Sequence, residues 1–213
     1  MLQFLEPTGE IYEGQFGSFT VDRSDRLSVV VYRGGIVLSA VALVSGTLLW
    51  FLLGTASLTL LGLLYGLFCL GLGLSLFTIH IYLKPLHRAL QLCWGIGCLG
   101  SVWVATHSST PFLQSLYDRP EALLLSGWVF VALTGIFFKE AFCFNRWETK
   151  FLTFLLPLLL GGHWLNLLPA PLEGGLLGAW CMLMLIFALR KLIQPIPPDL
   201  GDKSVFEYLA QQS

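Results

Sequence analysis

His163 is the histidine whose surroundings best suit chemistry inside a membrane. It lies in Gly161-Gly162-His163-Trp164 within an apolar segment, with Asn166 one helical turn further on. Polar side chains in a bilayer are costly and commonly mark functional sites. A neutral imidazole can ligate haem iron or chlorophyll magnesium, or relay protons, and the adjacent glycines would let a flat macrocycle approach. Because Trp164 is typical of a membrane interface, a hydrogen-bonded interfacial histidine is the structural alternative.

The segment 139–150 is the densest polar patch between apolar segments. Glu140 falls one turn beyond the apolar part of its segment, so we expect it to be partly buried and paired with a cation such as Arg146, Lys150 or Arg33. Asn145 suits a helix end. These residues predict either an ion-pair network that fixes a helical hairpin or a binding surface. The candidate binding residues of the chain are therefore Arg33, Glu140, Asn145, Arg146 and His163.

Gly62 and Gly66 form a GxxxG pair in an apolar segment. Small residues let helix backbones approach closely in lipid, where van der Waals packing drives helix association. We therefore expect these two glycines to form a helix-packing face. That face would serve either packing within the chain or docking of another membrane protein.

Several catalytic signatures are absent from the sequence. It has no Walker loop, HExxH, GxSxG or dinucleotide fingerprint, and its aspartates all lie outside the apolar segments. The five cysteines include no pair with zinc-site spacing. We therefore assign no catalytic residue, metal site or cofactor, and the balance favours a protein that is not an enzyme. The net charge of −1 and the scattered basic residues also give no case for nucleic acid.

Long apolar segments must position these residues. The chain is 55% hydrophobic and 12% charged, whereas soluble domains average about 25% charged residues. A helix of about 20 apolar residues crosses the hydrocarbon core of a bilayer. We therefore predict an all-α, polytopic membrane protein, a bundle of about six transmembrane helices within residues 34–191. The predicted spans are 34–54, 57–83, 89–105, 122–138, 151–168 and 172–189.

The basic residues predict the orientation of this bundle. With six spans, 11 of the 12 lysines and arginines fall on the side that holds both tails, and Arg119 falls on the other. The positive-inside rule then places both termini on the cytoplasmic or stromal side. In the tail 1–33, residues 11–21 suit either a short hairpin or a loose segment. In the tail 192–213, residues 202–210 suit a short amphipathic helix.

Three motifs carry a resemblance to a known family. They are Tyr32-Arg33-Gly34-Gly35, the run from Lys139 to Arg146, and the carboxy-terminal run from Gln194 to Asp199 that is followed by Gly201-Asp202-Lys203-Ser204. With these motifs the chain resembles an uncharacterised integral membrane protein family of cyanobacteria and plastids, over nearly its whole length. The resemblance implies a multi-pass protein of a cyanobacterial thylakoid or plasma membrane. It implies no catalytic or binding residue.

Three functional hypotheses follow. The first is a non-enzymatic accessory or assembly protein that presents its inner loop and tails to other membrane proteins, photosynthetic complexes among them. The second is a small-solute transporter or channel, which needs a water-filled cavity between the helices. The third is a pigment- or haem-binding protein that uses His163 or His80. The lipid bilayer is the one partner common to all three.

Overall fold

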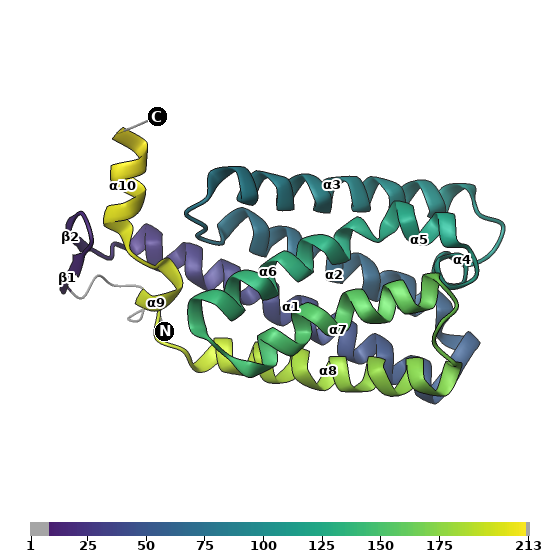
Figure 1. The fold of residues 1–213 in the computed structure, drawn as a ribbon. Helices are drawn as coiled ribbons and strands as arrows, with labels where there is room; N and C mark the ends of the chain where they lie inside the picture. Colours follow the sequence, from purple (N-terminus) through teal and green to yellow (C-terminus); the bar gives the residue numbers. More distant parts are fainter. Residues whose placement is uncertain (1–8, 212–213) are drawn as a thin grey trace.

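The computed structural model describes residues 9–211 of the chain. Long helices lie side by side along one axis, and a small hairpin with two short helices lies at one end (Figure 1). The predicted all-α membrane fold is confirmed. The bundle consists of α1 (Arg23–Leu53), α2 (Leu58–Thr78), α3 (Lys84–His107), α4 (Phe112–Asp118), α5 (Pro120–Ser126), α6 (Trp128–Phe144), α7 (Trp147–Trp164) and α8 (Ala170–Ile193).

Helix α1 begins at Arg23, well before the predicted first span at residue 34. Asp22 and Asp25 form a capping box in which each carboxylate accepts a hydrogen bond from the other residue's backbone N–H, at 2.9 and 3.0 Å. These bonds satisfy N–H groups that have no partner within the helix. The predicted amino-terminal tail therefore contributes its last residues to a bundle helix.

Helices α1 and α2 form an antiparallel pair joined by a 3-10 turn, η2 (Gly54–Ser57). Gly35, in the first half of α1, lies against Gly71, and Gly46 further along α1 lies against Leu61. The Ser39 hydroxyl also donates to the carbonyl of Phe68 at 3.3 Å. Gly54 makes the turn with a φ of +54°, a conformation that glycine adopts without strain.

The predicted fourth span is bent in the structure. Helices α5 and α6 meet at Gly127 with a 50° change in direction, and Pro120 begins the first of them. Helix α4, which the sequence reading placed within an outer loop, precedes this pair. Helix α7 contains Pro157, which cannot donate the usual backbone hydrogen bond. Both irregular helices thus lie in the part of the bundle that holds His163.

Among residues 9–211, three helical stretches are long and apolar enough to cross a membrane: 23–78, 84–107 and 170–193. The bent α5–α6 pair would add a fourth. The first stretch is the antiparallel α1–α2 pair, so it folds back on itself. Six spans and the side of the termini stay predictions.

Large apolar side chains occupy both the centre and the outside of the bundle. Phe68, Leu72, Leu133 and Phe137 are fully buried in its core. Many outward positions also carry exposed large apolar residues, including Leu63, Leu99 and Phe154. Such an apolar outer surface suits contact with acyl chains rather than with water, because side chains that face lipid have no water to bind.

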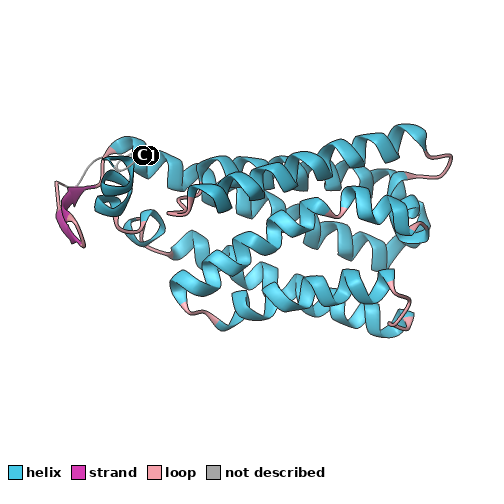
Figure 2. Ribbon diagram, turned by 45° about the horizontal axis from the view of Figure 1, so that its top comes forward, coloured by secondary structure: helices cyan, strands magenta, loops and turns pink. Residues whose placement is uncertain are grey.

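A small unit lies at the end of the bundle that holds both described chain ends (Figures 1 and 2). We call this unit the inner cap, and the two ends of the bundle inner and outer, after the side of the membrane predicted for the termini. The inner cap consists of strands β1 (Ile11–Gly14) and β2 (Gly17–Thr20) with helices α9 (Pro197–Leu200) and α10 (Lys203–Gln211). The strands pair antiparallel, with Tyr12 opposite Phe19. The structure thus shows the hairpin that was one of two alternatives for residues 11–21, and a helix where the amphipathic segment was predicted.

Candidate functional site: an ion cluster beneath the inner cap

Lys191 is the centre of a group of charged side chains at the inner end of the bundle. Its side chain is 0% exposed, and its Nζ lies 2.6 Å from Glu140 Oε2 and also contacts Asp199 Oδ1. The ring of Phe144 lies 4.4 Å from the same Nζ, close enough for a cation–π contact. Lys191 therefore joins α8 to α6 and to α9.

Arg33 of α1 binds the other oxygen of Asp199. Its Nε donates to Asp199 Oδ2 at 2.7 Å, and its Nη1 and Nη2 donate to the carbonyls of Gln194 and Pro195 at 2.6 and 2.8 Å. A planar guanidinium with five donors suits several acceptors at fixed positions. Arg33 thus holds the segment that leaves α8 as well as the carboxylate that follows it.

Glu140 accepts two further hydrogen bonds. The Tyr32 hydroxyl donates to Glu140 Oε1 at 2.8 Å, and Lys139 Nζ donates to the same oxygen at 3.0 Å. We call this group the ion cluster; it contains three cations and two carboxylates, all paired. A buried ion pair is costly to form and is most costly when one partner is removed. The ion cluster therefore joins α1, α6, α8 and α9. Its members are Arg33, Lys139, Glu140, Lys191 and Asp199.

The predicted partners of Glu140 were wrong. Lys139 and Lys191 pair with it, rather than Arg146, Lys150 or Arg33. The carboxyl-terminal tail folds back across α1 and brings Asp199 to Arg33. The reading from sequence missed Lys191 and Asp199, although Asp199 ends one of the three motifs noted above. All three motifs contribute side chains to the ion cluster.

Asn145 and Arg146 lie beside the ion cluster, in the turn between α6 and α7. Asn145 ends α6 with a left-handed φ of +51°, and its side-chain oxygen accepts from Lys150 Nζ at 2.6 Å. The Arg146 guanidinium lies 5.5 Å from the ring of Phe144. Glu148 follows, fully buried, with Arg190 Nη1 at 3.3 Å. This turn therefore extends the charged region toward the inner surface.

Asp202 connects the two tails in the inner cap. Its Oδ2 accepts from the backbone N–H of Gln15 at 2.6 Å, and its Oδ1 accepts from the Ser204 hydroxyl at 2.6 Å. The rings of Phe16 and Tyr208 stack with centroids 4.0 Å apart. Hairpin and tail thus form one unit on top of the ion cluster.

A groove crosses the exposed face of the inner cap. It lies between the hairpin and α10 and has a volume of about 290 Å³. Both polar and apolar side chains line it, which suits a peptide segment rather than a purely apolar ligand. We call it the cap groove; its lining residues are Ile11, Ser18, Phe19, Thr20, Lys203 and Glu207.

Asp202 gives the inner cap a dependence on pH. Hydrogen bonds from Ser204 and from the backbone of Gln15 lower the pKa of the Asp202 carboxyl below its ordinary value of 3.8. A carboxyl with a lowered pKa stabilises the folded arrangement above its unfolded pKa, and this contribution is lost as the pH falls through the folded pKa. We predict that the Gln15 amide stays protected from hydrogen exchange at neutral pH and loses protection below pH 3.8.

Hydrogen-exchange mass spectrometry of the intact protein, corrected for the intrinsic effect of pH, measures this protection. In Asp202→Asn, which cannot titrate, the acid step should disappear. A step of equal size in both proteins would assign the pH dependence to another group.

His163 lies at the opposite, outer end of the bundle. Its Nδ1 is 2.7 Å from Glu173 Oε1 of α8, and its Nε2 is 2.9 Å from the carbonyl oxygen of Tyr117 in α4. The Tyr117 hydroxyl also donates to Glu173 Oε2 at 3.2 Å. Both ring nitrogens are thus engaged, as in the hydrogen-bonded interfacial alternative. The structure does not bring His163 together with the other candidate binding residues.

The glycines that pack α1 against α2 are not the predicted ones. A Cβ at Gly62 or Gly66 would have no atom within 4 Å, so these two glycines face outward. A Cβ at Gly35 would lie 2.4 Å from the carbonyl oxygen of Gly71. Gly62 and Gly66 therefore contribute nothing to packing within the described part of the chain.

The described residues contain no cluster of potential metal ligands. No group of three histidine, cysteine, aspartate or glutamate side chains within residues 9–211 could hold a metal ion. His80, in the loop between α2 and α3, packs edge-on against Phe206.

Comparison with known proteins supports the membrane assignment. Residues 74–208, more than half of the chain, match the family described as "Uncharacterized integral membrane protein (DUF2301)". A protein of Haemophilus influenzae, described as "Uncharacterized protein", is 28% identical over 192 residues, which cover 88% of this chain and 94% of that protein. No solved structure matches the chain.

Proposed function

Because the chain belongs to the uncharacterised integral membrane protein family DUF2301 and is a multi-pass membrane protein, we propose that it is a non-enzymatic accessory protein that presents its inner cap to another membrane protein. The observation that carries this proposal is the construction of the inner cap. Two tails from opposite ends of the chain are held in one arrangement by Asp202 and by the ion cluster.

Order in the tails has a thermodynamic consequence for binding. Fixing a flexible segment costs conformational entropy, and a segment that is already fixed does not incur this cost when a partner binds. The ion cluster fixes the carboxyl-terminal tail, and the hairpin is fixed against that tail. The inner cap is thus a preorganised surface, which a docking function needs and a purely lipid-embedded protein does not.

The exposed residues of the inner cap suit a protein partner. Ile11 is an exposed apolar side chain that lines the cap groove together with the charged residues Lys203 and Glu207. Apolar anchors surrounded by polar groups are the usual composition of a protein–protein interface. We propose that a segment of the partner enters the cap groove and contacts these residues.

Reversing one charge in the cap groove tests the proposal. We expect Glu207→Lys to lower the amount of partner that co-purifies in mild detergent from native membranes about tenfold or more, the effect of losing a strong interface contact. Glu121→Lys is the matched control, because Glu121 is an exposed glutamate of α5, away from the inner cap. Mass spectrometry of both preparations quantifies the co-purified subunits. Equal recovery of the same subunits with both variants would refute the cap groove as the docking surface.

The resemblance noted from the sequence supports a finer location. We propose a cyanobacterial thylakoid or plasma membrane, with a photosynthetic complex as one class of partner. This location rests on the three sequence motifs. Fractionation of native membranes, followed by detection of the tagged protein, tests it.

A transporter is the second candidate, because polar groups lie at both ends of the bundle. The outer end has a polar cavity of about 300 Å³ that includes His163 and Glu173. The inner end has the ion cluster. Between them lie fully buried apolar residues such as Leu133, Ile136 and Met184. Transport would need a second conformation that separates these side chains, and solute flux in liposomes tests for it.

Pigment or haem binding is less favoured by the geometry of His163. A metal in a macrocycle needs a ring nitrogen with a free lone pair. At His163 one nitrogen faces the Glu173 carboxylate and the other faces the Tyr117 carbonyl. The absorption spectrum of the purified protein tests this alternative directly.

A further inference from the structure

Three adjoining cavities lie in the outer half of the bundle. Two are apolar, with volumes of about 390 and 440 Å³, and the third is the polar cavity of about 300 Å³. The polar cavity shares Leu123 and Trp164 with the first apolar cavity, and Tyr117 and Asp118 with the second. The polar cavity thus borders both apolar cavities, and each of the three has a volume typical of ligand pockets.

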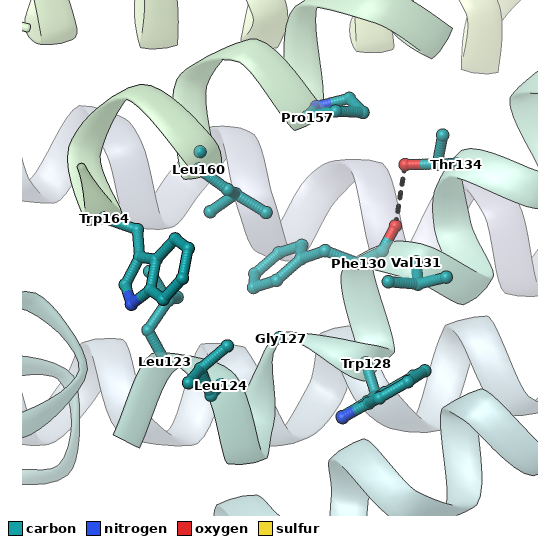
Figure 3. A pocket seen from close by; sticks show the side chains of 11 residues that line it. Leu123, Leu124, Gly127, Trp128, Phe130, Val131, Thr134, Pro157, Leu160 and Trp164 are labelled. Carbon is teal, nitrogen blue, oxygen red and sulfur yellow. Dashed lines mark hydrogen bonds between the residues drawn. The ribbon is translucent and has the colours of Figure 1, made fainter. Parts of the chain in front are cut away.

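The first apolar cavity results from two irregular helices. Helices α5 and α6 bend at Gly127, and α7 contains Pro157, so the helices separate between these positions. Figure 3 shows Phe130, Leu160 and Trp164 around the resulting space. A Cβ at Gly161, which also lines this cavity, would meet nothing within 4 Å. The walls are almost entirely apolar, as a hydrocarbon chain requires.

The second apolar cavity lies between other helices. Leu43 and Gly46 of α1, Leu61 of α2, Leu113 of α4 and Leu177 of α8 contribute to its walls. Phe130 lines both apolar cavities, so the two cavities adjoin at this residue. The polar cavity shares lining residues with both apolar cavities, so one polar group placed there could be linked to a chain in each of them.

The polar cavity carries an excess of acceptors. Both contacts of the His163 ring are with acceptors, the Glu173 carboxylate and the Tyr117 carbonyl. Asp118 also lines the cavity, so two carboxylates face it, and no lysine or arginine is among its lining residues. A ligand with a cationic head complements these carboxylates.

Donors for a negative group are also present in the polar cavity. The side-chain amide of Asn166 and the indole of Trp164 line it, and both carry N–H groups. Phosphate oxygens accept such hydrogen bonds. A ligand with an ammonium group near the carboxylates and a phosphate near these donors would pair with both kinds of polar group in the polar cavity.

We propose that the outer half of the bundle binds one two-chain phospholipid with an ethanolamine head. The head occupies the polar cavity, with its ammonium group facing Asp118 and Glu173. One acyl chain occupies each apolar cavity, on either side of Phe130. This site is separate from the inner cap, at the other end of the bundle.

Native mass spectrometry of the detergent-purified, full-length protein tests the site. The protein is incubated with equal amounts of phosphatidylethanolamine and phosphatidylglycerol that have the same acyl chains, and the retained lipid is counted. We expect about tenfold more phosphatidylethanolamine than phosphatidylglycerol, because the two heads differ by the ammonium charge. Equal retention of both lipids would overturn the proposal.

Two kinds of variant test the site of the lipid head and the site of the acyl chains separately. Glu173→Gln, or Asp118→Asn if the first variant does not fold, should remove the preference between heads. Gly161→Leu should fill the first apolar cavity and reduce retention of both lipids about tenfold, whereas Gly178→Leu, where a Cβ also meets nothing within 4 Å, should change nothing. Unchanged retention in folded Gly161→Leu would refute the placement of the chain.

Discussion

Lys191→Met is expected to destabilise the bundle by about 3–5 kcal/mol, the cost of breaking a buried ion pair by removing one partner. Lys191 is the contact that Glu140 and Asp199 share, and its side chain is fully buried. Methionine has a similar length but supplies no charge and no donor. The variant would leave the two carboxylates with Arg33, Lys139, Tyr32 and the side-chain amide of Gln194 as their partners.

Thermal unfolding in mild detergent, followed by size-exclusion chromatography of the heated samples, measures this loss. Lys84→Met is the matched control, because Lys84 is exposed at the start of α3 and should leave the unfolding temperature nearly unchanged. Adding Glu140→Gln to Lys191→Met should recover part of the loss, because one of the two buried carboxylates that lost the Lys191 contact is then uncharged. Equal unfolding temperatures for Lys191→Met and Lys84→Met would contradict the role of the ion cluster.

Gly35→Ala is expected to destabilise the α1–α2 pair by about 1–3 kcal/mol, the usual cost of overpacking a close contact. A Cβ at residue 35 would lie 2.4 Å from both the carbonyl oxygen of Gly71 and the hydroxyl oxygen of Ser75. One of these atoms belongs to the backbone, so relief requires the helices to move apart. The hydrogen bond from Ser75 to the Tyr32 carbonyl, 3.0 Å long, would lengthen as they do.

The neighbouring glycine provides the control for this substitution. A Cβ at Gly34 meets nothing within 4 Å, so Gly34→Ala should be neutral or stabilising by up to about 1 kcal/mol, the difference in helix propensity. Unfolding in increasing denaturant compares the two variants. A loss of the same size in both would show that helix propensity or local backbone effects, rather than close packing, explain the result.

The sequence predicted the all-α membrane fold because hydropathy and segment length are local properties of the chain. It did not predict the bend at Gly127 or helix α4, because both depend on how the outer ends of the helices pack. Gly62 and Gly66 do not pack α1 against α2, and their alternative role in docking another membrane protein stays a prediction. The spacing of Gly62 and Gly66 suits close approach, but spacing alone does not say which face of a helix meets a neighbour.

The ion cluster was partly predictable for a related reason. Glu140 lies just beyond an apolar segment, so its burial and its need for a cation followed from the sequence. Lys191 also follows an apolar segment, and there a solvated position near the membrane surface is the ordinary expectation. Its burial depends on the tail that carries Asp199 back across α1. A contact between segments this far apart in the sequence cannot be predicted from local composition.

Photo-crosslinking in native membranes tests the central claim, that the inner cap is where a partner protein docks. A photoreactive amino acid replaces Ile11 in the cap groove or, as the control, Leu52 at the opposite end of the bundle; both side chains are 69% exposed. We predict a discrete adduct with another membrane protein from position 11 and none from position 52. No protein adduct from position 11, or the same adduct from both positions, would contradict the account.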